Sequence, residues 1–197
     1  ESSSFIKKIN FDKKKFNIYF CGRIDLNVFD FITVLKALKI LKKDKIKFHF
    51  YLGGYGELDK LRNLINKNNL KDKVSILGFV NKYRHSILLK KTDLFIAPFF
   101  NNLNFSSNLS NKFIESIQYN LPILTPLKKD IAKFILKNNI GDIYKEKNHI
   151  NLAQKIKDLI IKLEQSNLIK KNIIKLSDTE FNHENNYSKF LRIINNC

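Results

Sequence analysis

Four polar residues near the middle of the chain recur at the spacing of one helical face. They stand at positions i, i+3, i+4 and i+7: Asn108, Asn111, Lys112 and Glu115. On a helix, Leu109, Phe113 and Ile117 would occupy another face. The spacing therefore predicts a helix that packs through one face and meets a polar partner through the other.

A second group of candidates follows segments that have the composition of buried strands. Arg23 comes directly after one such run at 16–22, where its forked guanidinium could bind a phosphate. Gly54 and Gly56 follow a second run, and Gly78 ends a third. In parallel α/β sheets, ligands bind beyond the carboxyl ends of the strands, so this arrangement predicts a ligand site at that edge.

Each of these features also has a purely structural interpretation. A single arginine after a strand is usually a surface residue, and glycines after strands usually make the turn. Lys112 and Glu115, three residues apart, could be a solvated pair on a helix surface. Their joint position with the other candidates at one edge of the sheet favours the functional interpretation.

Strand and helix alternate along most of the chain. Strands are expected at 16–22, 46–54, 73–79, 93–99 and 121–126, with a short one near 140–144. Helices are expected at 29–43, around 58–65, at 81–91, from near Ser110, at 131–136 and at 152–163. This order predicts an α/β domain over 1–165, a Rossmann-like parallel sheet with helices on both faces. The tail, 166–197, has helical stretches at 167–177 and 186–196 and is expected to pack on this domain or on a missing one.

The composition suits a globular domain and is strongly basic. The apolar fraction is 44%, and the formal charge of +18 comes from 36 basic and 18 acidic residues. Such a charge could signal nucleic acid, an anionic membrane surface or a phosphorylated ligand. Compositional bias is the alternative, because the lysines are scattered over many segments.

Several function classes are not supported by the sequence. Cys21 and Cys197 form no disulfide framework, and the four histidines have no metal-ligand spacing. The longest apolar run, 94–100, is too short to cross a bilayer. We therefore expect a cytoplasmic protein. The chain has no Met and starts at Glu1, from which we expect a piece of a longer protein.

Five stretches carry a resemblance to a known family. In order they are FCGRI, LGGYGELDKL, KVSILGFV, TDLFIAPF and NKFIESIQYNLPILTP. Together they resemble the C-terminal half of GT-B glycosyltransferases, the large retaining group called family 4, over about residues 16–165. The resemblance implies a Rossmann-like domain that binds a nucleotide-sugar donor. It also implies an N-terminal domain, missing here, that supplies most contacts to the acceptor.

The resemblance assigns roles to individual residues. Arg23 would contact the donor diphosphate, Glu115 would accept hydrogen bonds from the ribose hydroxyls, and the helix near Ser110 would aim its N-terminus at sugar and phosphate. The expected catalytic residues are Arg23, Lys112 and Glu115. The expected donor-binding residues are Gly22, Arg23, Asn27, Gly54, Gly56, Gly78, Phe79, Val80, Asn108, Leu109, Ser110, Asn111 and Glu115.

Two positions depart from the family pattern. The usual lysine after the arginine falls near Asn27, and a second family glutamate, seven residues before the first, corresponds to Asn108. Lys112 could replace the missing charge. Fixed positive groups and a helix N-terminus can stabilise the departing nucleoside diphosphate, so no metal is required.

The resemblance therefore implies the donor-binding domain of a retaining glycosyltransferase. The donor is expected to be a UDP- or GDP-linked sugar, and the acceptor a glycan or glycolipid. The positive charge could also assist peripheral binding to an anionic membrane. The isolated chain should bind nucleotide without turnover. A non-catalytic relative is one alternative, suggested by Asn27 and Asn108. A nucleic-acid-binding protein is another, but the aromatic residues lie mainly in expected core segments, so no nucleic-acid partner is expected.

Overall fold

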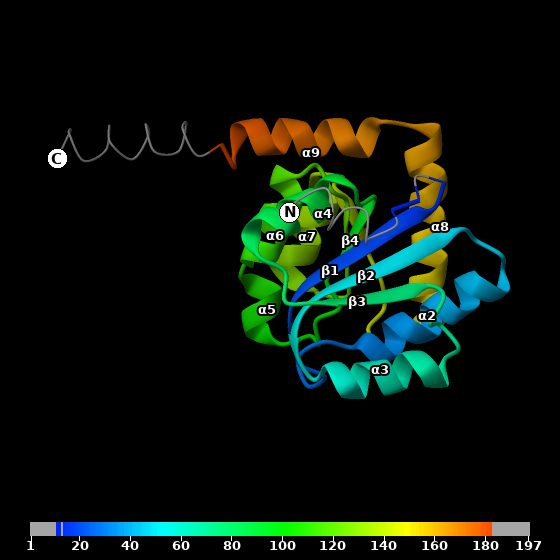
Figure 1. Ribbon diagram of the computed structural model, residues 1–197. Helices are drawn as coiled ribbons and strands as arrows, with labels where there is room; N and C mark the ends of the chain where they lie inside the picture. Colours follow the sequence, from blue (N-terminus) through cyan, green and yellow to red (C-terminus); the bar gives the residue numbers. More distant parts are fainter. Residues whose placement is uncertain (1–10, 13, 183–197) are drawn as a thin grey trace, which may run out of the picture.

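The centre of the fold is a parallel sheet whose strands are ordered β3-β2-β1-β4-β5-β6 (Figure 1). The computed structural model describes residues 11, 12 and 14–182. Its strands are β1 (Phe16–Ile24), β2 (Phe48–Gly56), β3 (Val74–Gly78), β4 (Leu94–Ile96), β5 (Ile123–Thr125) and β6 (Gly141–Ile143). Every pairing between neighbouring strands is parallel. The predicted Rossmann-like α/β fold is confirmed.

Helices cover both faces of this sheet. They are α2 (Phe31–Lys43), α3 (Leu58–Lys67), α4 (Lys82–Lys90), α5 (Leu103–Ser107), α6 (Asn111–Gln118), α7 (Lys129–Lys137), α8 (His149–Gln165) and α9 (Leu168–Thr179). The helices α2, α3 and α8 lie on one side, and α4, α6 and α7 lie on the other (Figure 1). Right-handed crossovers produce this division, because the chain moves outward from β1 to β3 and then returns to β4 and moves the other way.

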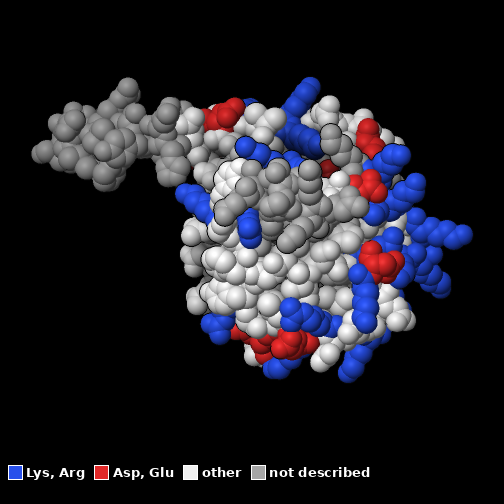
Figure 2. Space-filling view, in the orientation of Figure 1, with Lys and Arg blue, Asp and Glu red and all other residues white. Residues whose placement is uncertain are grey.

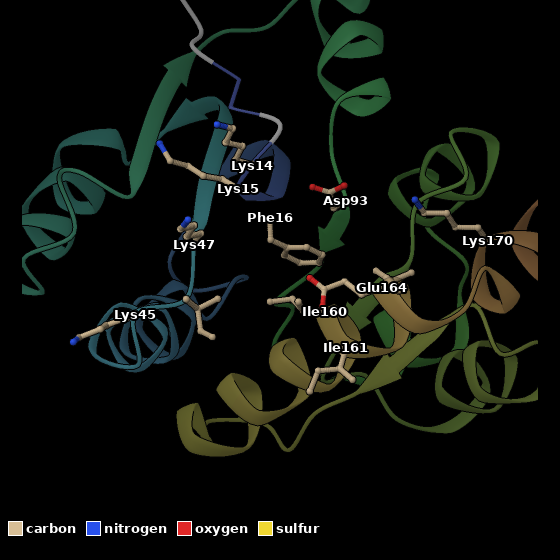
Figure 3. Close-up of a pocket in the computed structure, with 12 residues that line it drawn as sticks. Lys14, Lys15, Phe16, Lys45, Lys47, Asp93, Ile160, Ile161, Glu164 and Lys170 are labelled. Carbon is tan, nitrogen blue, oxygen red and sulfur yellow. The ribbon is translucent and has the colours of Figure 1, made fainter.

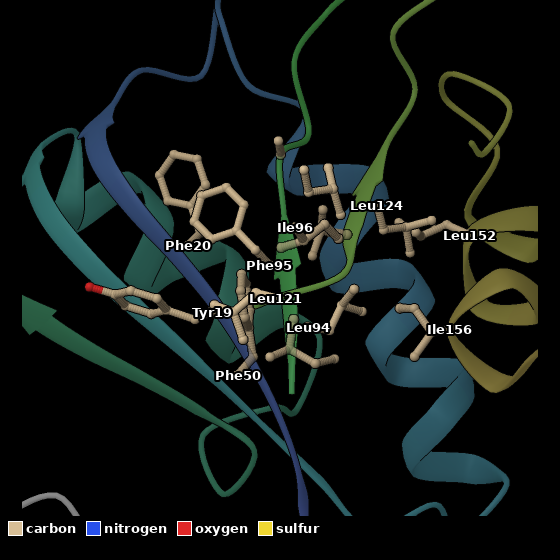
Figure 4. Close-up of a cluster of buried hydrophobic side chains, with 14 of the residues drawn as sticks. Tyr19, Phe20, Phe50, Leu94, Phe95, Ile96, Leu121, Leu124, Leu152 and Ile156 are labelled. Carbon is tan, nitrogen blue, oxygen red and sulfur yellow. The ribbon is translucent and has the colours of Figure 1, made fainter. Parts of the chain in front are cut away.

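β1 is the central strand and is held by aromatic packing. The ring of Phe20 lies edge-on to Phe31 of α2, with centroids 5.0 Å apart, and edge-on to Phe29 at 4.9 Å. Phe95 of β4 stacks at 6.5 Å from the same ring (Figure 4). Because Phe20 is fully buried, this cluster fixes the carboxyl end of β1 against its neighbours.

The order of the strands creates a topological switch point at the carboxyl edge. β1 pairs with β2 on one side and with β4 on the other, and the connections that leave β1 and β4 run in opposite directions. In an open parallel sheet, ligands bind at such a topological switch point. The residues after β1, and those between β4 and α6, therefore surround the expected site.

One predicted element is wrong in detail. The helix with the polar face begins at Asn111, whereas Asn108 has extended backbone angles and ends the separate short helix α5, which was not predicted. Ser110, the N-cap residue of α6, is extended as well, so Asn108 does not share a helical face with Lys112. The side-chain carbonyl of Asn101 accepts the N–H of Lys128 at 3.0 Å, and its amide donates to the carbonyl of Pro126 at 2.8 Å. These bonds tie the start of the segment between β4 and α6 to the turn after β5.

The C-terminal part is described only through residue 182. α9 corresponds to the helical stretch predicted at 167–177 and packs against α6. The second predicted stretch, 186–196, and Cys197 lie outside the described residues. Among the helices that the structure describes, none combines the length and apolar character needed to cross a bilayer.

Candidate functional site

Lys112 lies at the carboxyl end of β1. It comes from the first turn of α6, and its ammonium is 5.7 Å from the ring centroid of Phe20. Gly22 makes this position possible: a Cβ there would overlap the Lys112 ammonium, and its φ of +152° also favours glycine. Burial lowers the pKa of Lys112. The side chain is therefore a partly desolvated cation, which an anionic ligand would stabilise.

The N-terminus of α6 adds donors beside this cation. Ser110 is the N-cap residue, yet its side chain makes no capping bond to the helix. Its hydroxyl oxygen is buried and has no hydrogen-bond partner among the described residues. The first backbone N–H groups of a helix have no intrahelical acceptor, and the helix dipole favours an anion there. The site can therefore accept a phosphate group.

Glu115 lies one turn further along α6 and contacts His85 of α4. The distance from His85 Nε2 to Glu115 Oε2 is 3.3 Å, and His85 Nδ1 lies 2.8 Å from the hydroxyl of Tyr19 on β1. The hydrogen bond from His85 lowers the pKa of Glu115. Glu115 is therefore a carboxylate at neutral pH and can accept hydrogen bonds from hydroxyl groups of a ligand.

His85 is the best-connected titratable group of the site. Burial by itself would lower its pKa, but hydrogen bonds and negative charge from Cys21 and Glu115 outweigh that effect and raise the pKa to about 9. Burial would raise the pKa of the Cys21 thiol, but the hydrogen bonds from His85 and Tyr19 lower it. The imidazole is thus positively charged at neutral pH, which adds a second cation near Lys112.

The segment after β3 forms another wall of the site. A Cβ on Gly53 of β2 would lie 2.9 Å from Val80, 3.0 Å from the Tyr19 hydroxyl and 3.2 Å from the Cys21 sulfur. Val80 therefore leans over the ends of β1 and β2. The neighbouring Phe79 is 73% exposed and offers a free aromatic face at the rim.

Arg23 and the glycines of β2 occupy different environments. The side chain of Arg23 is 71% exposed and lies 3.9 Å from Asp25, so its guanidinium is in solvent and can turn towards a ligand. Gly54 and Gly56 belong to the end of β2, where they pair with Gly22 and Ile24. A side chain at Gly54 would collide with the carbonyl oxygen of Gly22. These glycines allow β1 and β2 to approach closely.

The structure thus brings only some of the predicted residues together. Six of them meet at the carboxyl edge close to β1: Gly22, Arg23, Val80, Ser110, Lys112 and Glu115. Gly78 and Phe79 border that group, and Leu109 packs against the core. Asn27, Asn108 and Asn111 are exposed, and the Asn27 N–H donates to the carboxylate of Asp25 at 3.0 Å.

Sequence reasoning missed Tyr19, Cys21 and His85. Tyr19 and Cys21 are two residues apart on β1, so their side chains face the same side of the sheet, and this spacing is detectable in the sequence. His85 lies 66 residues from Tyr19 and 30 residues from Glu115, and nothing local indicates that the three meet.

A basic cavity lies at the opposite edge of the sheet. It has a volume of about 590 Å³ and is lined by residues that include Lys14, Lys15, Lys45, Lys47 and Lys170, with Asp93 and Glu164 between them (Figure 3). Lys and Arg also gather at the right edge of the space-filling view, over the ends of α2 and α8 (Figure 2). Among the described residues, no group of three His, Cys, Asp or Glu side chains could hold a metal ion.

The charge of His85 can be tested by titration. We expect NMR to show His85 titrating near pH 9 and the half-buried His49, whose pKa is lowered mainly by desolvation, near pH 4. Glu115→Gln should lower the His85 pKa, because it removes a negative partner. Since the folded-state pKa is raised, the stabilisation due to His85 is complete below about 6.5 and is lost as the pH rises through about 9. A His85 pKa at or below its ordinary value would contradict this electrostatic description.

Known structures have the same fold as this chain at low sequence identity. HepE from Anabaena, solved in complex with UDP and glucose, has a TM-score of 0.76 and 15% identity, covering 99% of this chain and 52% of that one. WaaG, a glycosyltransferase involved in lipopolysaccharide biosynthesis, has a TM-score of 0.72 and 17% identity. The match covers 90% of this chain and 46% of WaaG. The chain therefore spans about half the length of these two proteins.

A third structure is itself a single domain. It is the C-terminal domain of LpcC, a glycosyl transferase group 1 family protein from Francisella tularensis, with a TM-score of 0.68, 17% identity and 90% of each chain covered. No curated protein matches the sequence. The model of the family Glycosyl transferases group 1 matches residues 1–176. Because that match covers most of the sequence, the chain belongs to the glycosyl transferases group 1 family.

Proposed function

We propose that this chain is the donor-binding half of a retaining glycosyltransferase that uses a UDP-linked sugar. The observation that carries the proposal is the convergence of Lys112, the α6 N-terminus and Glu115 at the switch point beside β1. In this arrangement, the diphosphate lies between Lys112, Arg23 and the first N–H groups of α6. The ribose hydroxyls donate to Glu115, and the base lies against the segment Gly78–Val80.

The chemistry of transfer suits these groups. When the bond between the sugar and the diphosphate breaks, negative charge grows on the leaving nucleoside diphosphate. A partly buried ammonium and a helix N-terminus are already oriented towards that charge and stabilise it more in the transition state than in the ground state. Lys112 and Arg23 therefore provide the positive charge that a metal ion could otherwise supply.

The donor and the acceptor are inferred partly from the structural relatives. HepE was solved with UDP and with UDP-glucose, which supports UDP over GDP as the nucleotide here. WaaG is described as acting in lipopolysaccharide biosynthesis, which supports a glycan or lipid-linked acceptor. Because the chain corresponds to about half of these proteins, we propose that an N-terminal domain supplies the acceptor site. The isolated chain then binds nucleotide without turnover.

Two positions favour a second candidate, a non-catalytic relative that retains the donor site. Asn27 and Asn108 occupy the places expected for a lysine and a glutamate, and both are exposed. Asn108 also lies outside α6. Sugar transfer by the full-length protein would support the enzyme, whereas nucleotide binding without transfer would support the non-catalytic relative.

Nucleotide binding by the chain is the first prediction of the proposal. Calorimetric titration with UDP, GDP and ADP should show saturable binding that is tightest for UDP. Lys112→Ala and Glu115→Ala should each weaken UDP binding about tenfold, the effect of losing about 1.4 kcal/mol from a charged hydrogen bond.

Matched controls are available far from the site. Lys170→Ala and Glu164→Ala remove the same side-chain types at the basic cavity and should leave UDP affinity unchanged. If Lys112→Ala and Glu115→Ala bind UDP like the unmodified chain, the proposed donor site is wrong.

We also propose that the basic cavity at the other edge contacts anionic membrane. Its five lysines surround apolar side chains, and Ile161 beside them is 49% exposed. Lysines near an anionic surface and an exposed aliphatic side chain both favour peripheral binding. This contact would leave the donor site, at the opposite edge of the sheet, open to solvent.

Vesicle binding tests this contact. The chain should sediment with vesicles containing phosphatidylglycerol and not with pure phosphatidylcholine. The triple variant Lys45→Glu, Lys47→Glu, Lys170→Glu should lose this binding, whereas Lys36→Glu, Lys60→Glu, Lys133→Glu, which makes the same change in net charge on exposed helix surfaces, should lose much less. Equal loss in both variants would show that net charge, and not this surface, is responsible.

A further inference from the structure

His85 connects three elements at the donor site. It lies on α4, while its two ring nitrogens face Tyr19 of β1 and Glu115 of α6. Its side chain is 16% exposed, whereas that of Glu115 is 46% exposed. The imidazole is therefore much less exposed than the carboxylate that it contacts.

We propose that His85 is a positioning residue that holds the Glu115 carboxylate in the orientation that accepts the ribose hydroxyls of the donor. This inference rests on the proposed function, because it assigns Glu115 that role. His85 itself is not expected to touch the nucleotide.

The need for such a residue follows from the flexibility of glutamate. A half-exposed glutamate on a helix surface samples several rotamers, and binding a diol would have to order it at a cost in entropy. The contact with His85 involves only Oε2 of Glu115. Oε1 and the remaining lone pairs stay available, and these are enough to accept two hydroxyl groups.

The hydrogen-bond pattern maintains this contact in both charge states of the ring. In the imidazolium form, Nε2–H donates to Glu115 and Nδ1–H donates to the oxygen of Tyr19. In the neutral form, the Tyr19 hydroxyl donates to Nδ1, which places the single proton on Nε2, again facing Glu115. Burial raises the pKa of Tyr19, so its hydroxyl remains available as a donor.

Charge adds to the strength of the contact. The groups that face His85 are Tyr19 and Cys21 from β1 and Glu115 from α6. Lys112 lies one turn before Glu115 on the same helix. A charged donor makes a stronger hydrogen bond to a carboxylate than a neutral one. The hold on Glu115 should therefore weaken when the ring loses its charge.

A double-mutant cycle on UDP binding tests the proposal. His85→Leu removes the hydrogen bonds of the ring while keeping an apolar side chain, and we expect it to raise the Kd for UDP about tenfold. His85→Gln keeps an N–H donor without the charge and should raise the Kd less. In the Glu115→Ala background, His85→Leu should cause no further loss, because the carboxylate that it positions is gone.

The pH dependence gives a second measurement. The ratio of the Kd of His85→Gln to that of the unmodified chain should approach one as the pH rises through about 9, where the ring of His85 loses its charge. Titration of the uracil base affects both proteins equally and cancels in this ratio. Thermal unfolding would confirm that the variants are folded, and His85→Gln carries the test if His85→Leu does not fold.

The outcomes distinguish this inference from the proposed function. If Glu115→Ala weakens UDP binding and His85→Leu has no effect, or has the same effect with and without Glu115, the positioning role is overturned while the donor site remains. If Glu115→Ala leaves UDP binding unchanged, the role of Glu115 itself is wrong and the inference falls with it.

Discussion

The parallel pairing of β1 with both β2 and β4 determines where the core closes and where the candidate site can form. It places β1 in the middle of the sheet, with its carboxyl end at the point where the connections diverge. The aromatic cluster around Phe20 secures that end. Gly22 then leaves room for the side chain of Lys112 from α6. The same strand therefore contributes both to the hydrophobic core and to the candidate site.

The site brings together charges that would cost free energy to bury separately. Lys112 and His85 are partly withdrawn from water, and the half-exposed Glu115 contacts His85. Electrostatic interactions are stronger in such a half-buried position than on an open surface. A ligand that carries both phosphates and neighbouring hydroxyls satisfies the cations and the carboxylate together. The geometry therefore favours a nucleotide over a simple anion, which would complement only Lys112 and the helix N-terminus.

Much of the fold could be predicted because its signals are local. The buried runs that form β1 and β4 and the amphipathic pattern of α2 are each contained in a short segment. The helical spacing from Asn108 to Glu115 was misleading, because Asn108 and Ser110 have extended backbone angles that separate α5 from α6, and periodicity does not register such a break. His85 could not be assigned a role from sequence, since its partners come from two other elements. Lys112 was predicted, but the dependence of its position on Gly22 required the structure.

A crystal structure of the chain with UDP would show whether the donor binds beside β1. We expect the diphosphate within hydrogen-bonding distance of the Lys112 ammonium and the first N–H groups of α6, with the ribose hydroxyls on Glu115. UDP bound in the basic cavity at the opposite edge, with Lys112 and Glu115 uncontacted, would contradict this expectation.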